Sequence, residues 1–291
     1  MHLSMLFSLK RRQGIPLDVF YTYWVNAHAA QIAARLPGID HLWLHEISYE
    51  DGQIWPHTEG VEFALAEADR FEGVPEPCFE TEEHLNQFLG AMEPLMTDEA
   101  NIFEETVAYP SMGDNSKTYK DLTPPSFSAP RFLKFLLFIR KTEGSVIEDF
   151  RRYMADDLAP SLAAADEVRK LRLHLLEPYC DDSPMADASA VSALAPPARR
   201  FDAAIEIAFE NGLDFARFST SAAWKKGTER RAAHMAACHA FKVNATHNLK
   251  RDGRLTFEGL RTPIVAKAIE QVAAISQFNA SVMALQEGRS S

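Results

Sequence analysis

Apolar and polar positions follow the same pattern twice along the chain. Residues 6–11 and 18–33 are matched about 130 residues later by residues 136–141 and 148–163. A repeat of this length indicates two copies of one domain, because stacked repeats have periods of roughly 20 to 50 residues. The copies differ at several polar positions, and these differences bear on which copy carries chemistry.

Each copy has hydrophobic spacing typical of the order strand, helix, strand, strand, helix, strand. In the first copy we expect strands over residues 5–11, 41–48, 61–70 and 102–109, and helices over residues 16–34 and 81–95. In the second copy we expect strands near 132–140, 169–177, 201–209 and 242–249, and helices near 145–164 and 219–237. A further helical pattern over residues 261–286 is expected to pack on the second domain.

This order of elements predicts an α+β fold. A βαββαβ unit forms an antiparallel sheet with both helices on one face, as in ferredoxin-like domains. The other face has to be covered, and a second sheet covers it most simply. We therefore predict two tandem ferredoxin-like domains whose antiparallel sheets pack face to face as an α+β barrel within one chain, with a cavity between the sheets.

The composition of the connecting segments predicts the domain boundaries. We expect an N-terminal domain over residues 1–110, a linker rich in Ser, Pro, Asp and Lys over 111–130, and a C-terminal domain over 131–291 that ends in a helix. The second copy carries an insertion over residues 181–199. An insertion of this length is either a lid over the site or a surface loop.

Charge and cysteine content narrow the class of protein. A net charge of −11 with scattered basic residues argues against a nucleic-acid partner. The apolar runs are far shorter than the roughly 20 residues of a membrane span, and the first residues lack the basic region and cleavage site of a signal peptide. The cysteines Cys78, Cys180 and Cys238 are too widely spaced for a CxxC zinc site or a disulfide framework. We expect a cytoplasmic protein with no membrane partner, and the sequence leaves open whether two chains pair as a homodimer.

The second strand of each copy carries the first candidates for chemistry. Alternation places His41, Trp43 and His45 on one face of the strand in the first copy. The matching positions in the second copy are Lys170, Arg172 and His174. We expect this face to point between the sheets, where His45 and His174 are candidate general acids or bases and the other four side chains are candidate substrate-binding residues. The alternative is that both histidines are hydrogen-bonded at the rim of the barrel.

Helix and strand-end residues supply the remaining candidates. His28 follows Trp24 by four residues and so shares its helix face, which makes His28 a candidate catalytic residue and Trp24 a candidate substrate contact. The alternative is that His28 only completes the packing between helix and sheet. Lys10 and Arg140 end the first strand of each copy and could hold an anionic oxygen, although a cation at a strand end is often only solvated. Glu67 and Glu206 are expected to match across the copies on the third strand, where they either orient a basic partner or form a surface salt bridge. Secondary candidates for lining a pocket are Tyr23, Tyr49, Trp55, His239 and His247.

Several common motifs are missing from the sequence. No GxGxxG follows a strand, no GxxxxGK[ST] is present, and no GxSxG presents a serine nucleophile. His41 and His45 lie on a strand, so their spacing does not match a helical zinc motif. We therefore expect no cofactor and no metal. A haem held by one histidine leaves no spacing signature, so a haem-dependent enzyme stays an alternative.

Three motifs follow one another in the first copy: Leu9-Lys10-Arg11 with Gly14, Phe20-x-x-x-Trp24-x-x-x-His28, and Leu36-Pro37-Gly38 before a strand that contains His45. Together they resemble the EthD domain of the dimeric α+β barrel superfamily, over most of residues 1–110 and more weakly over 130–255. The second copy keeps Phe150 but has Met154 and Leu158 in place of the tryptophan and histidine. The resemblance implies a small barrel cavity for hydrophobic, often aromatic or polyketide-like molecules, in a superfamily of cofactor-free monooxygenases, isomerases, cyclases and lyases with some haem enzymes.

We expect from these residues a cofactor-independent lyase, isomerase or dehydratase that acts on a small aromatic or polyketide-like substrate. A histidine would move the proton, and Lys or Arg would stabilise the developing oxyanion. The alternative from a different class is a carrier that only binds an aromatic metabolite. Several ionisable groups on the predicted cavity face favour catalysis.

Overall fold

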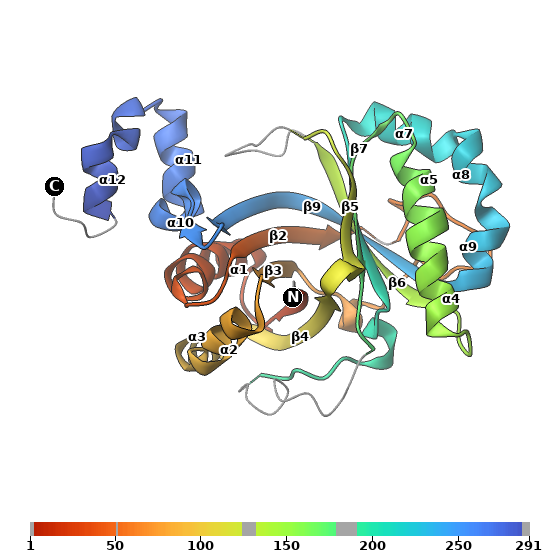
Figure 1. Ribbon diagram of the computed structural model, residues 1–291, viewed down its shortest axis with the longest axis horizontal. Coiled ribbons are helices and arrows are strands. Elements are labelled where there is room, and N and C mark those ends of the chain that lie inside the picture. Colours follow the sequence, from red (N-terminus) through yellow and green to blue (C-terminus); the bar gives the residue numbers. More distant parts are fainter. Residues whose placement is uncertain (1–2, 51, 124–131, 179–190, 287–291) are drawn as a thin grey trace.

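The computed structural model describes residues 3–50, 52–123, 132–178 and 191–286, and its architecture is the predicted α+β fold (Figure 1). The N-terminal copy contains strands β1 (Leu3–Arg11), β2 (His41–Tyr49), β3 (Gly73–Phe79) and β4 (Phe103–Met112), in the sheet order β4-β1-β3-β2. The C-terminal copy contains β6 (Leu133–Lys141), β7 (Val168–Leu175), β8 (Ala203–Phe209) and β9 (Met235–Arg251), in the order β9-β6-β8-β7. Both orders are those of a ferredoxin-like unit, and all the strand pairs are antiparallel.

The two sheets are joined edge to edge into one ten-stranded sheet. Strand β9 pairs with β6 over its first half and with β2 of the other copy over its second half. In the N-terminal copy two separate strands make the corresponding pairs. Strand β4 pairs with β1 of its own copy, and β5 (Ser116–Asp121) pairs with β7 of the other copy. Only the turn Gly113–Asn115 separates β4 from β5, so the sheet closes on itself as a barrel.

The helices cover the outer face of the barrel. In the N-terminal copy they are α1 (Leu17–Tyr23), the π-helical segment η1 (Trp24–Ile32), the 3₁₀ turn η2 (Ala33–Arg35), α2 (Glu82–Gly90) and α3 (Glu93–Glu99). In the C-terminal copy they are α4 (Ile147–Arg152), the π-helical segment η5 (Tyr153–Leu158), α5 (Ala159–Ala163), α7 (Gly212–Thr220), α8 (Ala222–Lys226) and α9 (Thr228–His234). No helix in the described ranges is long and apolar enough to cross a membrane.

Local sequence signals explain where the second helix of each copy begins. The side chain of Thr81 accepts a hydrogen bond from the backbone N–H of His84 at the start of α2. Asn211 does the same for the N–H groups of Leu213 and Asp214 at the start of α7. Side-chain oxygens at this position satisfy N–H groups that have no partner within the helix, which fixes the first residue of each helix.

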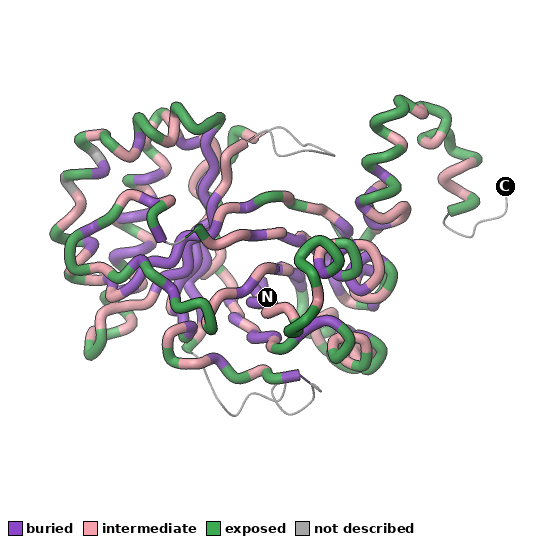
Figure 2. Tube along the Cα trace, turned by 180° about the vertical axis from the view of Figure 1, so that it is seen from behind, coloured by how far each residue is buried: buried purple, intermediate pink, exposed green. Residues whose placement is uncertain are grey.

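Three apolar cores follow from the alternation of the strands. One lies between the N-terminal sheet and its helices and includes Phe20, Trp24 and Phe88. A second occupies the same place in the C-terminal copy and includes Trp55 and Phe135. The third fills the inside of the barrel with side chains from both copies, mainly Leu6, Ile47, Phe71, Val74, Val107, Tyr109, Leu136, Phe138, Phe201 and Phe241. Figure 2 shows buried positions concentrated along the strands where the two copies meet.

Two of the predicted elements are wrong. The third strand of the first copy lies over Gly73–Phe79, and residues 61–70 contain only an isolated bridge and a 3₁₀ turn, Glu67–Asp69. The helix expected near 219–237 ends at His234 and is divided into α7, α8 and α9, so Met235 already belongs to β9. That strand is 17 residues long because it serves both sheets.

The C-terminal segment contacts strand β9 of the second copy, as expected, and also helix η1 of the first copy. It consists of β10 (Arg254–Leu255), α10 (Phe257–Arg261), α11 (Pro263–Gln271), η7 (Ile275–Phe278) and α12 (Ala280–Gln286). The backbone N–H of Ile264 donates to Asn26 Oδ1 on η1 at 2.9 Å. Helix α12 stands away from the barrel (Figure 1).

The division into domains over 1–110 and 131–291 stays a prediction. Residues 116–121 of the expected linker form β5, which adds a strand to the sheet of the C-terminal copy. Of the expected insertion over 181–199, residues 181–190 lie outside the described ranges. Ser192, in the remaining part, forms a parallel bridge with Glu105 of β4.

Candidate active site

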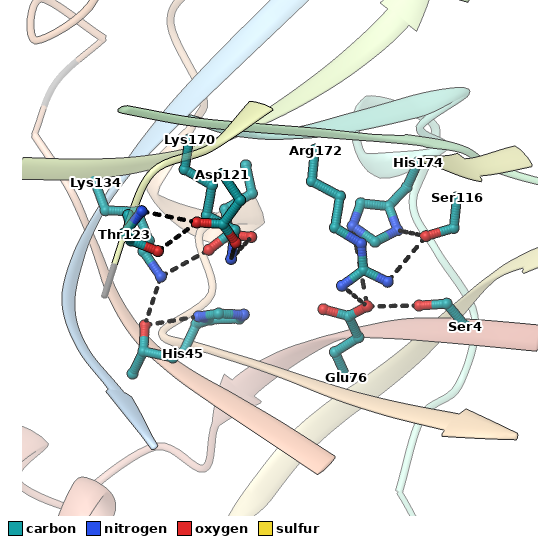
Figure 3. Close-up of polar contacts among 12 residues, drawn as sticks. Ser4, His45, Glu76, Ser116, Asp121, Thr123, Lys134, Lys170, Arg172 and His174 are labelled. Carbon is teal, nitrogen blue, oxygen red and sulfur yellow. Dashed lines mark hydrogen bonds and ion pairs between the residues drawn. The ribbon is translucent and has the colours of Figure 1, made fainter. Parts of the chain in front are cut away.

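Some of the residues predicted on the second strand of each copy meet inside the barrel, around two buried glutamates. Glu76 lies at the middle of β3 and Glu206 at the middle of β8, at equivalent positions in the two copies. Both are 3% exposed. Figure 3 shows Ser4, Arg172 and His174 around Glu76, and beside them a second group that includes Lys134, Lys170 and His45. The barrel interior therefore has a polar layer beside its apolar core.

The first group surrounds Glu76. Arg172 Nη1 lies 2.8 Å from Glu76 Oε1, and Ser4 Oγ donates to the same oxygen at 2.7 Å. Arg172 also donates to Ser116 Oγ at 3.0 Å, and that hydroxyl lies 3.1 Å from His174 Nδ1. These contacts join β1 and β3 of one copy to β7 of the other.

The second group surrounds Glu206. Lys134 and Lys170 form ion pairs with its two oxygens at 2.6 and 2.8 Å. Lys134 also donates to Thr246 Oγ1 at 3.1 Å, and this hydroxyl lies 3.0 Å from His45 Nδ1. This arrangement corresponds to the first group, because His45 is paired with Thr246 as His174 is paired with Ser116.

Burial controls the ionisation of these groups. Desolvation, with a smaller effect of nearby cations, lowers the pKa of His45 to about 3 and that of His174 to about 4. Burial alone would raise the pKa of Glu76, but Arg172, His174 and Ser4 lower it to about 2. Lys134 and Lys170 likewise hold the pKa of Glu206 well below its usual value. At neutral pH the layer therefore contains two carboxylates, three cations and two neutral histidines.

A cavity lies on the other side of the sheet from this polar layer, and not between the sheets as predicted. It has a volume of about 570 Å³ and lies between the outer face of the N-terminal sheet and the helices η1, α2 and α3, with Glu177, Pro178 and Ala193 also in its lining. Most of its lining is apolar, from side chains that include Met5, Leu44, Phe88 and Phe103. Trp24 and His28 line it as well, whereas His45 and His174 do not. The expectation of a cavity between the sheets is corrected, because aromatic side chains and ion pairs occupy the barrel interior there.

His28 forms a hydrogen-bonded pair with a carboxylate at the wall of this cavity. His28 Nδ1 lies 2.8 Å from Asp98 Oδ2, and the hydroxyl of Tyr23 donates to the other oxygen of Asp98 at 2.7 Å. The imidazole is 5% exposed and stands edge-on to Phe103. Among the described residues, Nε2 has no hydrogen-bond partner. The pair therefore leaves the second imidazole nitrogen without a partner among the described residues, on a side chain that lines an apolar cavity.

The pKa values of this pair favour a neutral base beside an ionised carboxylate. Burial lowers the pKa of His28, and the hydrogen bond and charge of Asp98 offset only part of that effect. Partial burial would raise the pKa of Asp98, but hydrogen bonds from Tyr23, His28 and Asn101 lower it. Asp98 then accepts from Nδ1–H and leaves the lone pair on Nε2.

The remaining predicted residues have other partners. Lys10 forms ion pairs with Glu104 and Glu105 at 3.0 and 3.4 Å. Arg140 is paired with Glu62 at 2.9 Å. The rings of His41 and Trp43 stack on each other with centroids 5.2 Å apart, and the Arg172 guanidinium lies 5.6 Å from the Trp43 ring.

Sequence reasoning missed Asp98 and Glu76. Asp98 lies on α3, and nothing in the local sequence distinguishes it from a surface acid. For Glu76 a signal existed, because Glu76-x-x-Phe79-Glu80 matches Glu206-x-x-Phe209-Glu210. The expected match of Glu206 with Glu67 is wrong, since Glu67 lies in a 3₁₀ turn outside the strand.

The donor sets of the structure do not favour a metal or a haem. No group of three His, Cys, Asp or Glu side chains within the described ranges could hold a metal ion. Haem carries two carboxylates that need cationic partners, and the described lining of the cavity contains Glu99 and Glu177 but neither Lys nor Arg. The residues of this cavity therefore do not fit haem.

Comparison with known proteins agrees with the fold. No family model matches the sequence, and no curated protein matches it. A crystal structure of a protein provisionally described as a monooxygenase from Fusobacterium nucleatum is similar with a TM-score of 0.52 and 7% identity, over 86% of this chain and 95% of that one. An anthrone oxidase-like protein is similar with a TM-score of 0.50 and 12% identity, over 85% and 93% of the two chains. Chlorite dismutase from Candidatus Nitrospira defluvii, in a mutant form, reaches a TM-score of 0.38 at 11% identity, over 84% and 91%.

At these identities the similarity concerns the fold and leaves the EthD label as a resemblance. The first two neighbours have the same barrel over nearly their whole length. The chain therefore has an α+β barrel fold, with both halves of the barrel supplied by one polypeptide.

Proposed function

We propose that this protein is a cofactor-independent enzyme in which His28 acts as general base on a small aromatic or polyketide-like substrate. The observation that carries the proposal is the 2.8 Å contact between His28 and Asp98 at the wall of an apolar cavity. A neutral imidazole oriented by a carboxylate is a recurrent arrangement for proton transfer.

The roles of the two residues follow from their positions. Asp98 holds the tautomer with the proton on Nδ1, so that Nε2 can accept a proton from an activated carbon or hydroxyl of the substrate. The imidazolium that forms is stabilised by the Asp98 carboxylate and can return the proton to another atom. Isomerases, dehydratases and lyases all can begin with this step.

The apolar lining restricts the substrate. Because no Lys or Arg of the described residues lines the cavity, negative charge left by proton removal has no cationic partner there. A substrate with a conjugated ring system spreads that charge over its own atoms. This supports aromatic ketones, phenols and related compounds, and it replaces the expected oxyanion contact from Lys10 or Arg140.

A carrier for aromatic molecules is the second candidate, and the mainly apolar lining supports it. The two candidates differ in what His28 contributes. A carrier needs only the shape of the cavity, whereas an enzyme needs the Nε2 lone pair.

The test is a His28→Leu variant, which introduces the residue found at the matching position of the second copy. Aromatic alcohols, lactones and polyketide-like ketones are screened for turnover and for exchange of substrate hydrogen with deuterated solvent. We expect His28→Leu to reduce the rate by roughly 10²- to 10⁴-fold while ligand affinity, followed by Trp24 fluorescence, changes little.

The matched control is His84→Leu. His84 Nδ1 also lies 2.8 Å from a carboxylate, that of Asp40, but the pair is outside the cavity lining. Its activity should equal that of the wild type. If wild type binds the compounds without turnover or exchange, the carrier is correct. A Soret band in the purified protein would contradict the cofactor-free proposal.

A further inference from the structure

A tryptophan of the N-terminal copy is inserted into the C-terminal copy. Trp55 lies between β2 and β3 and is 2% exposed. Its ring contacts aromatic rings from three elements of the other copy, with centroid distances of 5.4, 6.0 and 5.8 Å to Phe135 on β6, Phe218 on α7 and Trp224 on α8. The indole thus lies between the C-terminal sheet and its helices.

This position corresponds to the cavity of the N-terminal copy. The strand registers place Leu3 opposite Phe79 and Leu133 opposite Phe209, so Phe135 occupies the place of Met5. Likewise, Phe218 is the seventh residue of α7, as Phe88 is of α2. Met5 and Phe88 line the cavity, whereas their counterparts contact Trp55. One copy has an open volume where the other has an indole ring.

The segment that carries Trp55 is attached to the C-terminal copy by polar contacts. Arg231 Nε donates to Thr58 Oγ1 at 2.9 Å, and the Arg231 guanidinium lies 3.8 Å from the Trp224 ring. Two backbone hydrogen bonds join Glu62 to β9. The N–H of Glu62 donates to the carbonyl of Ala236 at 2.9 Å, and the N–H of Cys238 donates to the carbonyl of Glu62 at 2.8 Å. These contacts hold the indole in place.

The C-terminal copy also lacks the groups that we assign to catalysis. Leu158 and Met154 stand where the first copy has His28 and Trp24, and both are buried in the same core as Trp55. The copy that lacks a counterpart of His28 is therefore also the copy in which Trp55 fills the space that corresponds to the cavity.

We propose that Trp55 is a built-in occupant of a second aromatic-binding site. The chain binds one aromatic ligand, in the N-terminal copy, because its own side chain fills the equivalent site in the C-terminal copy. Removal of Trp55 opens that site to a flat aromatic molecule of the size of indole. The inference rests on the match between the copies and does not depend on the proposed reaction.

The test uses Trp55→Ala in the full chain, with indole as the probe. Trp55→Ala is expected to lower Tm by roughly 10 °C, because a large buried side chain is lost. Indole should then raise Tm of this variant more than that of the wild type, in proportion to the occupancy of the opened site. Calorimetric titration should give one more equivalent of bound indole than the wild type. Binding in the N-terminal cavity affects both proteins alike and cancels in the comparison.

Phe138→Ala is the matched control, since it removes a buried ring from the barrel interior. It should lose stability without a specific gain from indole, because a phenyl-sized space does not admit an indole. Trp55→Phe retains a ring at the site and should fold and bind no extra equivalent.

If Trp55→Ala folds only when indole is present, the inference is supported. It is overturned if Trp55→Ala shows the same response to indole as wild type, or if indole does not restore a variant that fails to fold. Neither result involves turnover, so failure of this inference is distinct from failure of the proposed function.

Discussion

At the scale of single residues, the His28–Asp98 pair sets the chemistry that the cavity can support. Its neighbours are apolar, so the imidazole is neutral at physiological pH and only Asp98 counters the cost of protonating it. Asp98 is a positioning residue in this scheme, because it acts through His28 and does not line the cavity.

Replacing Asp98 by Asn should reduce kcat by roughly 100-fold or more, because the amide no longer fixes the tautomer or stabilises the imidazolium. In the wild type, kcat/KM should fall only as the pH drops through the lowered pKa of His28, below the ordinary value of 6.5. This acid limb should move to still lower pH in Asp98→Asn, since the carboxylate raises the pKa of His28. The check is a pH profile of both proteins.

Tyr23→Phe serves as the control for this comparison. It removes one hydrogen bond to Asp98 but leaves the carboxylate in place. Its pH profile should keep the wild-type shape. An acid limb at or above pH 6.5 in the wild type would contradict the assignment of His28 as a buried base.

The polar layer inside the barrel leads to a separate prediction about how Glu76 contributes to stability. Glu76→Gln leaves Arg172 buried without its carboxylate, and breaking such a pair typically costs about 3–5 kcal/mol. We expect the free energy of unfolding, measured with urea, to fall by an amount of this order. Asp149→Asn, which breaks the exposed pair with Arg152, should have little effect. Equal stability of Glu76→Gln and wild type would show that this ion pair does not hold the two copies together.

At this scale the sequence predicted some site residues and not others. His28 and Trp24 share a helix face, and helical periodicity is enough to bring both to one cavity wall. Their partner Asp98 comes from α3, about 70 residues away along the chain, and no local pattern specifies that contact. The alternation of the strands correctly placed His45 and His174 on the inner face of the sheet. It could not show on which side of the sheet a cavity forms, because that depends on the volume of all neighbouring side chains.

At the scale of elements, β3 shows why periodicity alone located a strand wrongly. Pro75 and Pro77 lie inside this strand, although proline cannot donate to a sheet and argues against a central strand. Between Ser4↔Cys78 and Leu9↔Gly73, β1 and β3 have no paired positions, so the prolines interrupt the ladder on that side. The equivalent strand β8 has isoleucines at these positions and a complete ladder with β6. Both prolines line the cavity.

The start of β3 also supports the cavity wall. A Cβ at Gly73 would lie 2.8 Å from the Trp24 ring, which is closer than real Cβ contacts allow. Gly73→Ala should therefore displace Trp24 and weaken aromatic ligand binding several-fold, with a change in tryptophan fluorescence. Gly90→Ala is the control, because a Cβ there meets nothing within 4 Å. Unchanged fluorescence and affinity in Gly73→Ala would indicate that Trp24 does not depend on this contact.

At the scale of the whole molecule, the buried histidines make stability depend on pH. The pKa values of His45 and His174 are about 3 and about 4 in the folded protein, against 6.5 when unfolded. Below pH 6.5 the unfolded chain binds protons that the folded protein does not, so stability falls as pH decreases toward these values. Each histidine contributes roughly 1.4 kcal/mol per pH unit in this window.

Urea unfolding at pH 7 and pH 5 measures this effect, with an expected loss of a few kcal/mol at the lower pH. Ionised Glu76, whose pKa is about 2, adds a loss in the same direction below pH 4.5. His247 acts oppositely: Glu258 and Glu46 raise its pKa to about 9 despite burial, so its contribution is full below pH 6.5 and disappears as pH rises through 9. Equal stability at pH 7 and pH 5 would contradict the neutral, buried state of His45 and His174.

The overall architecture was accessible from the sequence because the repeat and the order of elements restrict it strongly. The closure of the barrel was not, because it depends on edge pairing between copies. A fourth strand that serves two sheets looks, in a hydrophobicity pattern, like an ordinary strand with polar residues at one end. The same limitation made β5 look like a linker.

The long strand β9 has a consequence for biosynthesis. The open edge of β2 in the first copy is paired only by residues near the end of β9, 241–250. A nascent chain therefore leaves the ribosome with that edge uncovered until residues 241–250 have been translated. Unpaired strand edges are sites of aggregation, so the interval between synthesis of β2 and of β9 is the period in which chaperone protection matters most.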